Sequence, residues 1–329
     1  MEEFDRRIDD ARQELTVPQR ITIQNDDANE TPRFEVWHWG FSLCSQKVRA
    51  VLNEKNIAYR SNELSFKKFE NYKPGYVRLR MFAAGKKNLG RLARDHSMRT
   101  SIDTEGFDAC VVPLLVDHLK RNVIIDSSKI IEYLDQEVPG NFLIPNDPSL
   151  EKNVRKQIVI NDGIPHPGIL YGFHDNDPRP NFYIDIMQNI YDQKRAALEP
   201  LIDQNKDDKE LVRVYRAKLE KEMAGKKRQK DPIYMSSILD EFKLLIFNLN
   251  QELAMSSGPW FFGATFTMAD CLWAISLYRM QWLGHAPLWS DCPLVEEYAN
   301  RLYLRPSMKK TMIEWPNPMP PSPHTINVD

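Results

Sequence analysis

The amino-acid sequence predicts a mixed α/β domain followed by an all-helical domain. Two observations carry this prediction. Strand-like apolar segments alternate with helical patterns from residue 34 to about residue 140, whereas the patterns beyond residue 150 have the spacing of amphipathic helices. The chain has 329 residues, which is enough for two domains with a hydrophobic core each.

The first domain has the predicted order β-α-β-β-β-α. Its strands are expected at 34–39, 57–64, 111–117 and 123–126. The first helix begins near Ser45, and Ser127 or Ser128 can cap the second helix. A basic insert at 65–108 separates the second and third strands. We expect the insert to be loop-like, and a connection of this length is usually functional or mobile.

The second domain is predicted to consist of helices, at 150–163, 181–203, 208–227, 232–256, 267–282 and 293–303. Thr267 and Asp270 form a capping box, and the apolar helix that follows is expected to be the core of this domain. The charged stretch 218–230 is predicted to be a solvated face or a mobile connection.

These patterns give four predicted regions. Residues 1–32 are a flexible extension with one short helix, and residues 33–140 form the α/β domain. Residues 150–312 form the helical domain, and residues 313–329 form a Pro-rich tail without regular structure.

Composition limits the classes of partner. The net charge of −2 gives no reason to expect nucleic acid or an anionic membrane, and no apolar stretch approaches the length of a membrane span. The charged N-terminal residues cannot be the apolar core of a signal peptide. The four cysteines lack metal-binding spacing, so we expect free thiols, no metal and a cytoplasmic location.

Cys44 is the candidate nucleophile. It lies in the sequence Ser42-Leu43-Cys44-Ser45, where an aromatic-rich strand turns into a helix. The free N–H groups and partial positive charge of a helix N-terminus favour a thiolate over a thiol. The alternative is that Cys44 packs beneath the helix, and that Ser42 and Ser45 only cap it.

Three motifs together resemble the glutathione transferase superfamily. They are the Ser42-x-Cys44-Ser45 turn, Val112-Pro113 before a strand, and Asp126-Ser127 at the start of a helix. The resemblance implies a thioredoxin-like first domain within the glutathione-transferase fold, and a helical domain, residues 150–312, that contributes the substrate pocket. It implies that Ser45, the backbone at Val112 and the cis-proline Pro113, and the pair Asp126 and Ser127 bind glutathione. Members of the family usually form dimers, so a homodimer is one option.

Further stretches resemble the members of this superfamily that reductively dehalogenate hydroquinones. They include residues 42–49, 76–80, 103–108 and 258–263. The resemblance implies that the partners are glutathione and a halogenated hydroquinone. Glutathione attacks the ring, Cys44 removes the glutathionyl group by thiol-disulfide exchange, and a second glutathione regenerates Cys44 and forms GSSG. Two glutathiones are then used per turnover, and Ser42 stabilises the attacking thiolate.

Several other side chains are candidates for contact with the substrate. His38 could donate a proton to the quinol, and His166 and Tyr171 could contact its hydroxyls. Arg78 and Arg80 in the insert could pair with a phenolate or with the glycine carboxylate of glutathione. The other three cysteines are expected to be inert, and three large side chains near the end of the apolar helix are expected to be core residues, namely Tyr278, Arg279 and Trp282.

Two alternative functions stay open at this point. One is a glutathione transferase or lyase that acts on aryl thioethers or quinones without net dehalogenation. The other is a non-catalytic binding protein with the same fold. The thiol at Cys44 favours an enzyme, because a binding protein does not need it.

Overall fold

The computed structural model describes residues 2–16, 20–22, 32–97, 102–316 and 319–325. The chain forms two compact units. Unit 1 comprises Met1–Ser45, Asn56–Ile130 and Gln188–Lys227, and unit 2 comprises Gln46–Lys55, Ile131–Met187 and Arg228–Asp329. The division therefore differs from the single boundary near residue 140 expected from the sequence, because residues 188–227 belong to the unit that holds the sheet.

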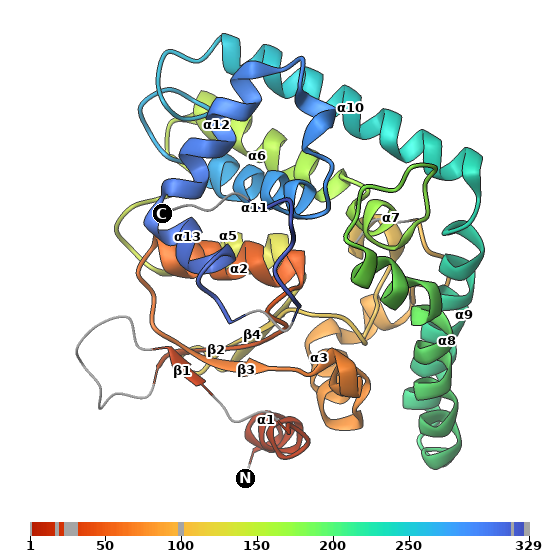
Figure 1. Cartoon of the computed structure of the whole chain (residues 1–329). Coiled ribbons are helices and arrows are strands. Elements are labelled where there is room, and N and C mark those ends of the chain that lie inside the picture. Colours follow the sequence, from red (N-terminus) through yellow and green to blue (C-terminus); the bar gives the residue numbers. More distant parts are fainter. Residues whose placement is uncertain (1, 17–19, 23–31, 98–101, 317–318, 326–329) are drawn as a thin grey trace. The chain divides into compact units, whose positions relative to one another are not determined.

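Unit 1 contains a five-stranded mixed sheet in the order β1-β3-β2-β4-β5 (Figure 1). The strands are β1 (Arg20–Thr22), β2 (Phe34–His38), β3 (Tyr59–Glu63), β4 (Leu114–Asp117) and β5 (Asn122–Ile125). Strand β2 pairs in parallel with β3 and antiparallel with β4, and β4 pairs antiparallel with β5. The last four strands correspond to the four predicted ones and confirm the thioredoxin-like sheet. Strand β1 extends it beyond β3.

Two helices follow strands of this sheet as predicted. Helix α2 (Leu43–Glu54) begins after β2, and α5 (Ser127–Glu137) begins after β5. The residue that caps α5 is Asp126, not Ser127 or Ser128. Its Oδ1 accepts a hydrogen bond from the Ser128 N–H at 3.1 Å, and its carbonyl accepts one from the Ile130 N–H at 2.9 Å.

The insert is largely helical, so the prediction of a loop was wrong. It contains the 3₁₀ turns η1 (Phe66–Lys68) and η2 (Glu70–Tyr72) and the helices α3 (Pro74–Leu89) and α4 (Ile102–Glu105). Tyr76, Val77 and Leu79 of α3 are buried in the core of unit 1. Gly85 interrupts α3 with a φ of 64°, and a buried arginine, Arg80, breaks the apolar pattern from which a helix would be predicted.

The N-terminal segment contains a folded helix, α1 (Glu3–Gln13). Phe4, Ile8 and Ala11 lie on one face and are buried in the core of unit 1. The Arg12 Nε also donates to Glu35 Oε1 on β2 at 2.9 Å. The predicted short helix is therefore present, but the description of this segment as flexible is wrong for residues 3–13. Most of residues 17–32 lie outside the described part of the chain.

Two long helices, α8 (Asn181–Gln204) and α9 (Lys209–Arg228), contribute to unit 1. Leu198 of α8 and Leu211, Val214 and Tyr215 of α9 are buried in the same core as the insert. Lys218 and Lys221 are also buried, so the prediction of a solvated face was wrong for these two residues. They pair with carboxylates of the insert, and such pairing is what allows charged groups to be buried.

Unit 2 is helical. Its elements include α6 (Pro148–Gly163), α7 (His166–Tyr171), α10 (Pro232–Ala254), α11 (Met268–Trp282), η3 (Ala286–Trp289), α12 (Pro293–Leu304) and α13 (Pro306–Met312). Helix α11 packs against α6, α12 and α13, and its Thr267–Asp270 capping box is present as predicted (Figure 1). In the described part of the tail after Trp315 there is no helix or strand. Among the described helices, none is long and apolar enough to cross a membrane.

Candidate active site

The register of the sheet brings three predicted motifs to one edge of unit 1. Trp37 of β2 lies opposite Leu114 of β4, and Leu114 lies opposite Ile125 of β5. Because β2 and β5 leave the sheet where β4 enters it, the turn with Cys44, the Val112–Pro113 peptide and the Asp126–Ser127 pair all emerge at this edge. The structure therefore brings together motifs that lie far apart in the sequence, with Cys44 and Asp126 separated by 82 positions.

Cys44 lies in the first turn of α2; its thiol is half-buried and is not part of a disulfide bond. Ser42 precedes the helix, and its Oγ accepts a hydrogen bond from the Ser45 N–H at 3.3 Å. This is the bond of an N-cap residue. Ser42 is only half-buried, and a hydroxyl that accepts one hydrogen bond can still donate one to a ligand.

Two predicted site residues of this region are fully buried. Ser45 has no exposed surface, and its Oγ accepts a hydrogen bond from the Trp39 N–H at 3.3 Å. His38 also has no exposed surface, and its Nε2 lies 2.6 Å from the Ser61 Oγ on β3. Both side chains are engaged inside the protein, so we remove Ser45 from the glutathione-binding residues and His38 from the substrate-binding residues.

The Val112–Pro113 peptide bond is cis, as the resemblance implies. In the described part of the chain neither the N–H nor the C=O of Val112 has a hydrogen-bond partner. The carbonyls around it are held by the insert. Asn71 Nδ2 donates to Cys110 O at 2.7 Å, Tyr76 Oη donates to Val111 O at 2.7 Å, and Arg80 Nη1 donates to Pro113 O at 2.7 Å.

These contacts correct the expectation for the two arginines of the insert. Arg80 is buried and holds the backbone at Pro113, so it is not available to a substrate. Arg78 pairs with Asp208 at 3.0 Å. The role of Arg80 could not be predicted from the sequence, because its partner is a backbone carbonyl 33 residues away.

Asp126 and Ser127 occupy the end of β5 and the start of α5. Asp126 has a φ of 77°, a left-handed conformation that is rare for residues other than glycine and is often found at functional sites. Its two carboxylate oxygens accept one backbone hydrogen bond each, from the N–H groups of Ser128 and Ile102, both at 3.1 Å. The Ser127 hydroxyl has no partner among the described residues.

The predicted substrate-binding residues His166 and Tyr171 belong to unit 2. Both lie on α7, where Tyr171 is half-buried and His166 is buried. The His166 Nε2 lies 3.1 Å from the Ser276 Oγ, whose proton is donated to Asn161 Oδ1 at 2.9 Å. The Asn161 Nδ2 donates to the Gln157 carbonyl, which fixes the orientation of this amide.

This chain of hydrogen bonds determines the tautomer of His166. Because the Ser276 hydroxyl donates to Asn161, it accepts from His166, so the proton lies on Nε2. The Nδ1 atom is then an acceptor, and it is buried with no hydrogen-bond partner among the described residues. Burial and the charges of Lys47 and Arg279 lower the pKa of His166 well below its usual value, which keeps the ring neutral.

Comparison with known proteins identifies the family. Residues 41–137 match the model of the glutathione S-transferase N-terminal domain. The 2,5-dichlorohydroquinone reductive dechlorinase of Sphingobium indicum is 39% identical, over 96% of this chain and 95% of that protein. The chain belongs to the glutathione transferase superfamily.

More distant members extend the comparison. The ganglioside-induced differentiation-associated protein 1-like 1 of Homo sapiens is 24% identical over 84% of this chain and 73% of that protein. The tetrachloro-p-hydroquinone reductive dehalogenase of Sphingobium chlorophenolicum is 22% identical over 86% of this chain and 98% of that protein. The solved structure of the beta-etherase LigF from Sphingobium sp. strain SYK-6 covers 85% of this chain and 98% of its own, at 17% identity and a TM-score of 0.56, which supports the transferase fold.

The other cysteines of this transferase differ from Cys44 in exposure. Cys110, Cys271 and Cys292 are buried. Burial, with the negative charge of Asp108, raises the pKa of the Cys110 thiol, and burial also raises the pKa of the Cys271 thiol well above its usual value. These thiols lack the exposure that a nucleophile requires. Among the described residues there is no cluster of three side chains that could hold a metal ion.

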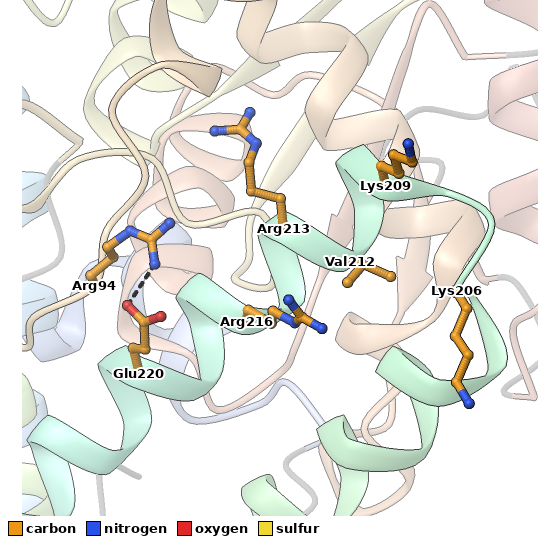
Figure 2. A pocket seen from close by; sticks show the side chains of 7 residues that line it. All are labelled: Arg94, Lys206, Lys209, Val212, Arg213, Arg216 and Glu220. Carbon is orange, nitrogen blue, oxygen red and sulfur yellow. Dashed lines mark hydrogen bonds and ion pairs between the residues drawn. The ribbon is translucent and has the colours of Figure 1, made fainter.

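A basic hollow of about 490 Å³ lies along α9 in unit 1 (Figure 2). Arg94 and Glu220 form an ion pair of 2.6 Å across it. None of the predicted site residues lines this hollow, so we do not include it in the candidate active site. Its lining residues are Arg94, Lys206, Lys209, Val212, Arg213, Arg216 and Glu220.

Proposed function

We propose that this transferase catalyses the glutathione-dependent reductive dehalogenation of a halogenated hydroquinone. The observation that carries the proposal is the sheet edge at which Cys44, Val112–Pro113 and Asp126–Ser127 emerge together. The identity of 39% to a 2,5-dichlorohydroquinone reductive dechlorinase, over nearly the whole of both chains, supports the choice of substrate class.

Glutathione is proposed to bind along this edge. The unpartnered N–H and C=O of Val112 are suited to pair with the backbone of the cysteinyl residue of glutathione. Asp126 follows β5 at this edge, and its carboxylate is suited to hold the γ-glutamyl ammonium group by a charge-assisted hydrogen bond. The free Ser127 hydroxyl can bind the γ-glutamyl carboxylate.

The reaction follows from the two thiols. The glutathione thiolate, stabilised by a hydrogen bond from Ser42, attacks the keto tautomer of the quinol, and chloride leaves. The Cys44 thiolate then attacks the glutathionyl sulfur, and the electrons of the broken S–C bond pass to the ring, which takes a proton. A second glutathione thiolate attacks the Cys44 mixed disulfide and releases GSSG. The chlorine is replaced by hydrogen, and two glutathiones are oxidised.

His166 is proposed to accept a hydrogen bond from a hydroxyl of the quinol. Its Nδ1 is a buried acceptor that no described residue pairs with, and Asn161 and Ser276 hold the ring in that tautomer. Tyr171 lies on the same short helix and is proposed as a second contact. Replacing His166 with Phe should raise KM for the quinol about tenfold, from the loss of one hydrogen bond, and leave KM for glutathione unchanged. Equal changes in both constants would contradict this role.

Two further proposals concern the cellular location and the oligomeric state of the protein. The four cysteines are all free, which is typical of a reducing compartment, so we infer a cytoplasmic location. A homodimer is proposed from the family alone. Sedimentation of the purified chain tests this assembly directly.

The proposed reaction is tested by incubating the protein with 2,5-dichlorohydroquinone and glutathione. Chloride and GSSG should appear in equal amounts, together with the dechlorinated quinol. A stable glutathione conjugate without GSSG would instead indicate a transferase or lyase. No turnover and no binding of glutathione would indicate a non-catalytic binding protein.

A further inference from the structure

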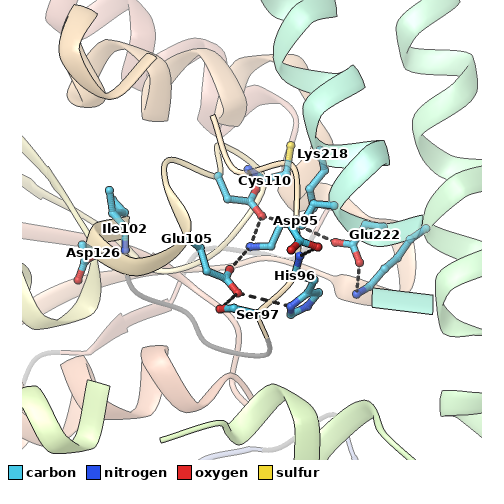
Figure 3. Close-up of polar contacts among 12 residues, drawn as sticks. Asp95, His96, Ser97, Ile102, Glu105, Cys110, Asp126, Lys218 and Glu222 are labelled. Carbon is cyan, nitrogen blue, oxygen red and sulfur yellow. Dashed lines mark hydrogen bonds and ion pairs between the residues drawn. The ribbon is translucent and has the colours of Figure 1, made fainter. Parts of the chain in front are cut away.

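The insert and α9 are joined by a cluster of ionisable side chains that are buried, except for the partly buried Lys194. We name it the insert–α9 ion cluster, and its members are His96, Glu105, Asp108, Lys194, Lys218, Lys221 and Glu222 (Figure 3). Lys221 pairs with Glu105 at 2.6 Å, and Lys218 pairs with Asp108 at 2.7 Å. All seven side chains lie in unit 1.

The cluster is built from matched charges. Lys218 also pairs with Glu222 at 2.6 Å, and Glu222 pairs with Lys194 of α8 at 2.8 Å. Burial would raise the pKa of the Asp108 carboxyl, but Lys218 and Lys221 outweigh it and hold that pKa far below its usual range. Removing one charged member would leave the cluster with an uncompensated buried charge, so the ion pairs fix the insert on α9 firmly.

The segment that the cluster fixes also contacts Asp126. Glu105 ends the short helix α4, and Ile102 begins it. The Ile102 N–H donates to Asp126 Oδ2 at 3.1 Å (Figure 3). The Ser128 N–H donates to the other carboxylate oxygen, Oδ1, also at 3.1 Å. The Asp126 carboxylate is therefore oriented from two sides, by its own helix and by the insert.

We propose that the insert–α9 ion cluster positions Asp126 for the γ-glutamyl ammonium group of glutathione, and that the Ile102 N–H transmits this effect. The inference rests on the proposed function, which assigns the ammonium group to Asp126. Ile102, Glu105 and Lys221 act as positioning residues, because none of them contacts glutathione in this proposal. The function of the insert is then to hold the anchor of the co-substrate in one orientation.

The transmitting hydrogen bond can be removed by a proline. Ile102 is the first residue of α4, a position where proline is well tolerated but supplies no N–H. Ile102→Pro should weaken the binding of glutathione about tenfold by titration calorimetry, while kcat at saturating glutathione changes less than about twofold. Lys209→Pro is the matched control, since Lys209 begins α9 and its N–H has no partner among the described residues.

The cluster itself is tested by Glu105→Gln, with Glu220→Gln as the control on the exposed face of α9. Glu105→Gln should raise KM for glutathione about fivefold and leave kcat nearly unchanged. If this variant does not fold, the double variant Glu105→Gln with Lys221→Gln removes both charges and avoids an unpaired one. It should show the same rise in KM.

Asp126→Asn is measured in parallel, to separate the two proposals. If Asp126→Asn weakens glutathione binding and the Ile102 and Glu105 variants do not, the positioning role is wrong and the anchor stands. If Asp126→Asn has no effect on glutathione binding, the anchor and the positioning role are both wrong. Weakening by all three, with both controls unchanged, supports the inference.

Discussion

At the scale of single residues, the chemistry depends on the contrast between one accessible thiol and three buried ones. Cys44 is half-buried at the start of α2, whereas Cys292 is only 6% exposed. Thiol-disulfide exchange requires an attacking thiolate with access to the sulfur that it attacks. Cys44 therefore differs from the other three cysteines by its accessible position at the edge of the sheet.

Cys44→Ser should reduce the formation of dechlorinated quinol by about three orders of magnitude or more, because a serine hydroxyl cannot form the mixed disulfide. The aryl thioether of glutathione should accumulate instead. Chromatography of the products measures both effects. Cys292→Ser is the control and should retain turnover; loss of activity in both variants would point to misfolding and not to chemistry.

Ser42→Ala should have two separate effects. Loss of the N-cap bond to the Ser45 N–H should lower the free energy of unfolding by about 1 kcal/mol. Loss of a hydroxyl donor should move the formation of the glutathione thiolate to higher pH, as followed by ultraviolet absorbance of the bound complex. Ser237→Ala, on the exposed face of α10, is the control. An unchanged thiolate titration would restrict Ser42 to its capping role.

At the scale of elements, the long helices after residue 150 were predictable, whereas the helix of the insert and the buried polar contacts were not. The capping box at Thr267 and the apolar run after it predicted α11 within a residue or two of its bounds. Helix α3 was missed, because the buried Arg80 and the kink at Gly85 disturb its apolar pattern. Lys218 and Lys221 suggested a solvated face, since the carboxylates that pair with them lie about 110 residues away.

In the candidate site, too, motifs were predictable from the sequence and buried contacts were not. The motifs at Cys44, Pro113 and Asp126 could be identified from the sequence, because each sits at a strand end with a characteristic residue type. The burial of His38 could not be predicted from the sequence. Strand β2 is buried on both faces, so its residues do not alternate between apolar and polar in a way that would show which side chains are buried. The proposed role of Ile102 could not be predicted either, because it depends on the backbone N–H and not on the side chain.

Asp270 of α11 gives a prediction at this scale. Its carboxylate accepts hydrogen bonds from the Phe261 N–H, the Thr267 N–H and the Tyr298 hydroxyl, and the group is buried. Asp270→Ala should therefore lower the free energy of unfolding by about 3 kcal/mol or more, because several buried donors lose their acceptor. Urea denaturation measures the loss. An equally large fall for Asp240→Ala, an exposed acid on α10, would contradict this explanation.

At the scale of the whole molecule, buried ionisable groups make the fold sensitive to acid. Burial, followed by the neighbouring His174, lowers the pKa of His285 to about 4, and burial also lowers the pKa of His96 and His166. Burial would raise the pKa of Glu35, but hydrogen bonds from His118 and Arg12 lower it to about 2. The histidines are thus kept neutral, and the carboxylates are kept charged.

The pKa shifts of the histidines and of the carboxylates both predict that the fold loses stability as the pH falls. Between pH 6.5 and about 4 the unfolded chain binds protons on histidines that the folded chain leaves neutral, so stability decreases, by about 3 kcal/mol for His285 alone. From about pH 4.5 to 2, glutamates such as Glu35 become protonated in the unfolded chain but stay charged in the folded chain. The stability of the fold therefore decreases further. Thermal melts should therefore show a falling Tm from pH 6.5 downward. His285→Phe should flatten the upper part of this decrease, and an unchanged slope would contradict the assignment.

The central claim is that Cys44 receives the glutathionyl group from an aryl thioether. Mass spectrometry of the protein after reaction with 2,5-dichlorohydroquinone and limiting glutathione tests it most directly. The account predicts one glutathione in disulfide linkage on the peptide that contains Cys44, and its removal by excess glutathione. Release of chloride and formation of the dechlorinated quinol with no glutathione on Cys44 at any time would contradict it.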